Sequence, residues 1–368
     1  MRRGCCAWLE ASRPNRTPEV FDRFGDAPTL ADSASITIAE AGKQWIAAKA
    51  RAGREQATVA QYRQHVDLHI VPFIGTTKLS AFNAPALAAF EDRLHEEGRS
   101  PAMIRKVRVS LGSLIAHAQR RGLSVRNIVR ELRGAASDAR AEKRARRRLR
   151  VGVDIPSPAE VKALVATTGG KWRPILLTAI FCGLRASELR GLAWVDVDLE
   201  GKTLQVRQRA DRFNAIGRPK SETSERDMPM PPILVNELRR WKLACPKGKL
   251  GLVFPNGEGN VESLGNIINR GLVPAMIRAG VTVATGEVDK DGKPIRTAKY
   301  TGMHSLRHFH ASWLINSRAA GGLGLTPKEV QERLGHATLA MTVDTYSHLF
   351  PRSDNAEQMA EAERALLA

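Results

Sequence analysis

Apolar residues recur every three or four positions over residues 36–137, the spacing that puts them on one face of a helix. Thr37 is placed to cap the first of these helices, and Pro72 is expected to end the second in a turn. The expected helices span 37–49, 58–69, 84–95 and 101–121. Four or five helices with short connections predict an all-α bundle.

The pattern changes after residue 157. Ser157-Pro158 with Glu160 predicts another helix start, and an apolar helix over 174–182 is expected to end at Gly183. Apolar and polar residues then alternate over three short stretches, 195–199, 203–207 and 226–230, which predicts strands. A polar stretch with a hairpin turn and helices over 304–314, 327–334 and 338–346 follow. We therefore expect a mixed α+β domain with a small antiparallel sheet, in a chain that is mostly helical.

A charged segment with almost no apolar residue separates the two regions, and two prolines and a glycine follow it. We place the domain boundary there. The predicted organisation is an N-terminal extension over 1–35, where disorder is one interpretation, a helical domain over 36–137, a basic linker over 138–156, a second domain over 157–350 and a tail over 351–368 that could form a short helix.

The formal net charge of the chain is +19. It is divided as +8 over 36–137, +5 over 138–150, +8 over 151–350 and −2 over 351–368, while the first 35 residues are neutral. Such an excess favours a polyanion, most often nucleic acid, over a small neutral ligand. The alternative is a basic surface that only serves solubility. The candidate DNA contacts are Lys43, Arg105, Lys106, Arg108, Arg144, Arg146, Arg147 and Arg148.

Several classes of protein are excluded by the composition. No apolar run reaches the length of about 18 residues that a membrane-spanning helix needs. The N-terminus lacks the apolar core of a signal peptide. The four cysteines have no disulfide or zinc spacing, which fits a reducing cytoplasm.

Residues with candidate chemistry are spread over the second region. Arg185 follows a buried helix and its glycine, so it is either an ion-pair partner of Glu188 or a rigidly mounted anion ligand. His304 and Arg307 lie at positions i and i+3 of one helix, where they could hold a phosphate and move a proton. His304 and His308 have the i, i+4 spacing of metal ligands, but no HExxH pattern or acid cluster accompanies them, so we expect no metal.

Three further residues indicate a function only when they are taken together with the others in their order along the chain. Lys220 lies in a polar hairpin connection, where a lysine is usually solvated. His336 follows a helix C-terminus, a position that stabilises positive charge. Tyr346, one of three tyrosines in the chain, follows ten residues later.

Taken in order, these positions resemble the tyrosine recombinase family, the phage-type integrases. The matching stretches are Gly183–Leu189, Pro219-Lys220 with Arg226 and Pro229, His304–His308, Leu334–His336 and Thr345–His348. The order and spacing of the five parts are specific, whereas any one of them alone would be weak. The family's helical core-binding domain and mixed catalytic domain also match the predicted boundary.

The resemblance implies a site-specific DNA recombinase that integrates or excises a phage or another mobile element. Tyr346 would attack a DNA phosphodiester and form a 3′-phosphotyrosyl bond. Arg185 and Arg307 would hold the non-bridging oxygens, His304 would exchange a proton with the tyrosine, Lys220 would protonate the leaving 5′-oxygen, and His336 would hydrogen-bond the phosphate. Glu188 and His308 would support these groups, and no cofactor would be needed.

The same resemblance implies duplex DNA attachment sites as partners, a homotetramer on paired sites and accessory DNA-bending or excision factors. It places the protein in the bacterial cytoplasm or nucleoid. Two alternatives use the same residues differently or not at all. One is a type IB-like topoisomerase that relaxes DNA without exchanging strands, and the other is a non-catalytic DNA-binding regulator.

Overall fold

The computed structural model describes residues 36–124, 126–132, 148–219, 221–350 and 356–368, apart from the side chains of 222, 356–358 and 362. The chain divides into two compact units, Met1–Ala141 and Glu142–Ala368. This division falls inside the predicted linker over 138–156. The extension over 1–35 and the basic residues Arg144, Arg146 and Arg147 lie outside the described residues.

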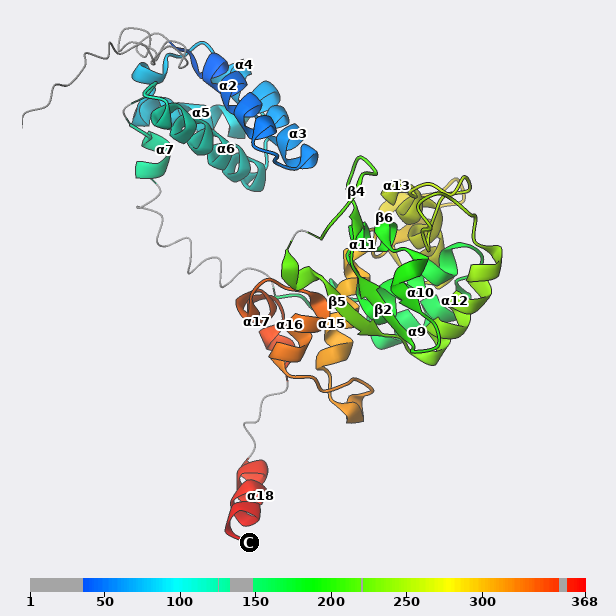
Figure 1. Cartoon of the computed structure of the whole chain (residues 1–368). Helices are drawn as coiled ribbons and strands as arrows, with labels where there is room; N and C mark the ends of the chain where they lie inside the picture. The colour runs from blue at the N-terminus through cyan, green and yellow to red at the C-terminus, as the bar shows by residue number, and fades with distance from the viewer. Residues whose placement is uncertain (1–35, 125, 133–147, 220, 351–355) are drawn as a thin grey trace, which may run out of the picture. The chain divides into compact units, whose positions relative to one another are not determined.

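The first unit is helical where it is described, and Figure 1 draws it in blue and teal. Thr37 caps its first helix through a reciprocal pair of hydrogen bonds with Glu40, as its sequence predicts. Its apolar faces enclose a core around Trp45, Phe90 and Leu111. The α-helices are α2 (Ile38–Arg51), α3 (Gln56–His65), α4 (Val71–Ile74), α5 (Ala84–Glu96), α6 (Pro101–Arg120) and α7 (Ile128–Glu131).

The expected turn at Pro72 is wrong. The backbone widens into a π-helical turn over Val66–Ile70, and helix α4 then continues through Pro72 to Ile74. Proline lies in the first turn of α4, where its missing N–H group costs nothing.

The second unit packs helices around a small sheet (Figure 1). Strands β1 (Val197–Asp198), β2 (Thr203–Val206) and β5 (Arg226–Pro229) form an antiparallel sheet in the order β1-β2-β5. Two separate hairpins pair β3 (Arg209–Ala210) with β4 (Ile216–Gly217) and β6 (Thr282–Val288) with β7 (Pro294–Ala298). The α-helices are α9 (Pro158–Thr167), α10 (Trp172–Cys182), α11 (Ala186–Gly191), α12 (Pro232–Ala244), α13 (Leu264–Asn266), α14 (Val273–Arg278), α15 (His304–Ile315), α16 (Pro327–Leu334), α17 (Leu339–Tyr346) and α18 (Ala356–Leu367).

The sheet is shorter than expected at its first strand. Val195 is 90% exposed and belongs to a short 3-10 turn over Trp194–Asp196, so pairing starts only at Val197. The carboxylate of Asp198 accepts from the backbone N–H groups of Glu200 and Gly201, which starts the next turn at once. Otherwise the predicted fold class is confirmed, with a helical first unit and a mixed second unit.

Helix α10 is apolar on nearly all sides and lies at the centre of the second unit. It packs against α12 and α15, and its residues Ile175 to Ile180 are buried in the largest core of the unit. A smaller core, which includes Leu314, Val330 and Leu334, joins the ends of α15 and α16 to Tyr346 of α17. The candidate active-site residues therefore lie where α10, α15, α16 and α17 end or meet.

Candidate active site

Arg185 is held by the residues on both sides of it. Helix α10 ends at Gly183 in a left-handed conformation (φ 58°), which turns the chain so that Arg185 becomes the N-cap of α11. Its backbone N–H donates to Oε2 of Glu188 at 2.9 Å, and its Nη1 donates to Oε1 of the same carboxylate at 2.7 Å. Because the side chain is still 30% exposed, one side of the guanidinium remains open to solvent.

Glu188 joins a second arginine to the first. Its side chain is 2% exposed, and its Oε2 accepts from Nη2 of Arg226 at 2.9 Å. Burial alone would raise the pKa of Glu188, but Arg226 and Arg185 outweigh it and hold the pKa below its usual range. The carboxylate therefore stays charged and partly balances the two guanidinium groups.

Arg226 is a site residue that the sequence reasoning did not select for a role. It comes from β5, where Arg226 and Met228 point inward, and it lies only a few residues beyond Lys220. Its Nε donates to the carbonyl of Arg333 at 2.9 Å and its Nη1 to the carbonyl of Ser224 at 2.8 Å. The sequence could have indicated it, because Arg226 occupies an inward position of an alternating strand. A charge buried there needs an ion-pair partner or a bound anion.

Arg307 of α15 is the most buried arginine of the group, at 2% exposure. Its Nη1 donates to the carbonyl of Gly183 at 2.7 Å, and its Nη2 donates to the carbonyl of Leu334. Burial and the neighbouring Arg185 and Arg226 lower the pKa of Arg307 to about 9. The group is therefore still charged at pH 7.

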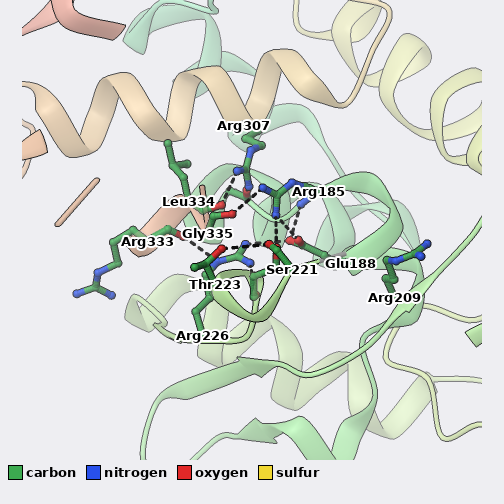
Figure 2. A network of polar contacts seen from close by, with 12 residues as sticks. Arg185, Glu188, Arg209, Ser221, Thr223, Arg226, Arg307, Arg333, Leu334 and Gly335 are labelled. Atoms are coloured by element: carbon green, nitrogen blue, oxygen red, sulfur yellow. Dashed lines mark hydrogen bonds and ion pairs between the residues drawn. The ribbon is translucent and has the colours of Figure 1, made fainter. Parts of the chain in front are cut away.

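Helix-end carbonyls surround these cations (Figure 2). Nη2 of Arg185 donates to the carbonyl of Gly335 at 2.8 Å, one residue beyond the carbonyl that Arg307 binds. Gly335 ends α16 at φ 60°, and a Cβ atom there would lie 2.9 Å from Nη1 of Arg226. The C-terminal ends of α10 and α16, which carry partial negative charge, thus hold Arg185 and Arg307 side by side.

The cluster of Arg185, Arg226 and Arg307 carries three positive charges against the one negative charge of Glu188. Burial limits the screening of this excess by water. An excess of fixed guanidinium charge with one open side is suited to a phosphate or another oxyanion.

Tyr346 lies beside this cluster, at the end of α17. Its side chain is 2% exposed and packs in the smaller core with Val330 and Leu334. Its hydroxyl is hydrogen bonded to Nδ1 of His308 at 2.7 Å. Burial raises the pKa of Tyr346 to about 12, although the charge of Arg307 acts in the opposite direction. The phenol is therefore protonated at neutral pH and needs an acceptor for its proton.

The ring of His336 is stacked on that of Tyr346. Its ring lies parallel to that of Tyr346 within 2°, with 6.4 Å between the centroids, and its Nδ1 is hydrogen bonded to Oγ1 of Thr342 at 2.9 Å. Burial, together with Arg307, Arg185 and Arg226, lowers its pKa to about 4. Burial and the three nearby arginines thus oppose the positive charge that the end of a helix by itself would favour.

His304 and His308 of α15, the two histidines nearest the arginine cluster and Tyr346, differ in their surroundings. His304 is exposed, and partial desolvation and the charges of Arg307 and Arg185 lower its pKa. His308 is half-buried and lies edge-on to His304, with 5.2 Å between the ring centroids. We expected His304 to be the partner of Tyr346, but the structure gives that hydrogen bond to His308.

Lys220 lies outside the described residues. The next residue, Ser221, is hydrogen bonded through its hydroxyl to that of Ser224 at 2.9 Å. The hydroxyl of Ser224 lies 3.4 Å from Nη1 of Arg185. The loop is thus attached to the arginine cluster directly after Lys220.

The candidate DNA contacts outside this cluster are of two kinds. Lys43, Arg105, Lys106 and Arg148 are exposed. Arg108 is half-buried and forms an ion pair with Glu91 at 3.3 Å, so its charge is already partly balanced. Among the described residues, no group of three or more His, Cys, Asp or Glu side chains could hold a metal ion, and no helix is long and apolar enough to cross a membrane.

Comparison with known proteins gives one consistent result. Residues 157–352 match the phage integrase family. The chain is 23% identical to a XerC-like tyrosine recombinase of Caldanaerobacter subterraneus subsp. tengcongensis, across 87% of this chain and 81% of that protein. It is 26% identical to the prophage integrase IntR of Escherichia coli, across 58% of this chain and 51% of that protein.

Two solved structures have a similar fold. The Tn1549 transposon integrase, solved with a circular intermediate DNA, aligns with a TM-score of 0.66 and 19% identity, over 90% of this chain and 100% of that chain. A lambda integrase tetramer bound to a Holliday junction aligns with a TM-score of 0.57 and 17% identity, over 86% of this chain and 83% of that chain.

Proposed function

Because this chain belongs to the phage integrase family of tyrosine recombinases, we propose that it cuts and rejoins duplex DNA at specific sites through a covalent bond to Tyr346. The observation that carries the assignment of residues is the arrangement of Tyr346 beside the cluster of Arg185, Arg226 and Arg307. The charge of Arg307 acts directly on the phenol, and the hydroxyl already has a hydrogen-bond partner in His308.

The arginine cluster supplies the electrostatic part of the reaction. In-line attack of the phenol oxygen on a phosphodiester gathers negative charge on the non-bridging oxygens. Arg185 has an open side toward solvent, and Arg307 is fixed next to it by two carbonyls, so their donors are oriented before DNA binds. Fixed donors of this kind lower the barrier because they need no reorganisation during the reaction. Glu188 and Arg226 keep Arg185 in place.

The remaining roles concern protons and hydrogen bonds. The leaving 5′-oxygen needs a proton, which we assign to Lys220 in the loop attached to the cluster at Ser221. His304, on the exposed side of α15, and His336, beside the tyrosine, are assigned to the phosphate. The covalent bond to Tyr346 conserves the phosphodiester energy, so the strand can be rejoined without a nucleotide cofactor.

The partners follow from the same reasoning. We propose duplex attachment sites as the substrate and a homotetramer on two paired sites as the active assembly, in the integration or excision of a phage or another mobile element. The lambda integrase tetramer on a Holliday junction is the similar structure that supports the tetramer. Accessory DNA-bending or excision factors and a location in the bacterial cytoplasm or nucleoid belong to the same proposal.

The test is a suicide duplex that carries the crossover region of the attachment site, taken from the repeat that borders the encoding gene, with a nick that lets the cut fragment diffuse away. The wild-type chain should form a protein–DNA adduct that survives denaturation. Tyr346→Phe should bind the duplex and form no adduct. Tyr62→Phe is the matched control, because that ring packs against Trp45 in the first unit. An adduct with Tyr346→Phe would overturn the assignment, and relaxation of DNA without attachment sites would indicate a topoisomerase.

A further inference from the structure

His308 directly follows Arg307 on α15, yet the two side chains contact different groups. Arg307 donates to the helix-end carbonyls at the arginine cluster, whereas Nδ1 of His308 lies 2.7 Å from the hydroxyl of Tyr346. The two rings meet at 63°, with 5.8 Å between their centroids. A distance of 2.7 Å is that of a short, well-formed hydrogen bond.

We propose that His308 accepts the proton of Tyr346 at Nδ1 when the phenol oxygen attacks DNA, so that His308 rather than His304 is the first general base of the reaction. This inference rests on the proposed function and extends it, because it assigns the first proton transfer to a specific atom. Nδ1 of His308 already has the contact that such a transfer requires.

The surroundings of His308 keep its ring uncharged at neutral pH, so that Nδ1 can accept a hydrogen bond. Burial, His304 and Arg307 lower its pKa to about 4, while Asp154 acts in the opposite direction. At neutral pH the imidazole is therefore uncharged, and in the tautomer protonated at Nε2 the lone pair of Nδ1 faces the phenol. Tyr346 itself has a raised pKa, so it keeps its proton until a phosphate is in place.

The step balances without another reactant. The phenol oxygen of Tyr346 forms a bond to phosphorus while the bond from phosphorus to the 5′-oxygen breaks. The phenolic proton moves to Nδ1 of His308, which becomes an imidazolium ion. The 5′-oxygen takes a separate proton from the general acid that we assign to Lys220. In the rejoining step both transfers run in reverse, and His308 returns its proton to the tyrosine oxygen.

His304 has a different position. It is exposed, it lies edge-on to His308, and it is affected by the charges of both Arg307 and Arg185. These surroundings place it on the side of α15 that faces the arginine cluster and solvent. It is thus better suited to a DNA phosphate than to the buried phenol.

Two substitutions of His308 separate proton transfer from positioning. In His308→Asn, the amide oxygen takes nearly the place of Nδ1, so it can accept the hydrogen bond but cannot hold a proton. In His308→Phe both abilities are lost and the ring volume is kept. Cleavage of the suicide duplex by the full-length chain should fall by about 10²-fold or more in both variants. Thermal unfolding and gel-shift binding would show that each variant is folded and binds DNA.

The pH profile and a modified substrate complete the test. Wild-type cleavage should be nearly flat from pH 6 to 9, whereas in His308→Asn the rate should rise with pH as hydroxide takes over the proton. A duplex with sulfur at the 5′-bridging position needs no acid for its leaving group, since a thiol has a pKa of only about 8.5. This substrate should not rescue either variant of His308, but it should rescue Lys220→Ala.

Specific outcomes would overturn the inference. If His308→Asn cleaves at the wild-type rate with a flat profile, His308 only positions the tyrosine. If His308→Phe cleaves faster than wild type, the contact restrains the tyrosine instead of activating it. If the sulfur substrate restores either variant, His308 acts on the leaving group. All three outcomes require a wild-type adduct, so they differ from a failure of the proposed function, in which the wild-type chain would form none.

Discussion

Glu188 accepts a hydrogen bond from Nη2 of Arg226 at 2.9 Å, with both side chains at no more than 6% exposure. The same carboxylate also binds Arg185. A single buried acid therefore fixes the relative positions of two arginines, one at the N-cap of α11 and the other on β5.

The first prediction concerns that acid. Glu188→Ala should lower the free energy of unfolding by about 3–5 kcal/mol, because it leaves buried guanidinium charge without its partner. It should also abolish cleavage, since Arg185 loses its anchor. Urea unfolding and the suicide-duplex assay would measure both effects.

Glu237→Ala is the matched control for this prediction. Glu237 is buried and forms ion pairs with Arg173 and Arg240, but it does not contact the arginine cluster. It should destabilise the second unit and leave the cleavage rate of the folded fraction unchanged. Equal loss of cleavage in both variants would show that the effect of Glu188 is only structural.

The second prediction concerns Gly183. An alanine Cβ at this position would lie 2.3 Å from the ring of His310, and the backbone has φ 58°. Gly183→Ala should destabilise the protein by about 2–4 kcal/mol, from overpacking and the left-handed backbone together. It should also weaken cleavage, because the carbonyl of Gly183 holds Arg307.

Gly170→Ala separates the two causes. Gly170 has φ 62° with open space around the added Cβ. Only the backbone cost of about 1 kcal/mol applies there. Thermal unfolding of both variants would measure the difference, and equal shifts in Tm would contradict the predicted clash with His310.

The third prediction concerns acid stability. Burial first, and nearby cations in addition, lowers the pKa of His308 and His336 to about 4 and that of His310 to about 3. A histidine with a lowered pKa binds protons mainly in the unfolded state, so stability is unaffected above about pH 6.5 and falls as the pH drops below it. Each such histidine should cost about 1.4 kcal/mol per pH unit in that window.

Calorimetry between pH 7.5 and 5 would test this slope. His310→Asn should make it shallower, because the amide can replace the Nδ1 contact with the carbonyl of Ile180 but does not titrate. His95→Gln, at an exposed position of α5, should leave the slope unchanged. An identical slope for wild type and His310→Asn would show that this histidine does not contribute.

The fourth prediction concerns binding to DNA. Affinity should fall steeply with salt, and each phosphate contact contributes about 0.9 to the slope of log K against log salt concentration. Arg105→Gln and Lys106→Gln should each reduce the slope by about 1 if these exposed groups touch the backbone. Arg108→Gln should reduce it less, since Glu91 already balances its charge. Equal effects of Arg105 and Arg108 would contradict this distinction.

Much of the fold could be predicted from the sequence because helix signals are local. Capping at Thr37, Ser157 and Thr326 needs only the residues within one turn, and each of the three forms a capping box with the glutamate three residues later. The order of Arg185, Arg307 and Tyr346 likewise identified the family, since spacing along the chain is enough for a motif. The interruption before Pro72 could not be predicted, because a π-helical turn depends on packing in the bundle.

The sequence by itself thus determined the helices, the class of reaction and the types of residue that perform it. Only the tertiary structure decided which groups touch. In the tertiary structure, Glu188 joins Arg226 to the cluster, and the hydroxyl of Tyr346 is hydrogen bonded to His308. Burial lowers the pKa of His336, so its ring is neutral at pH 7. The physical reason is that hydrogen bonds and pKa values depend on distances of a few ångströms and on burial. Both are set by elements that meet from distant parts of the chain.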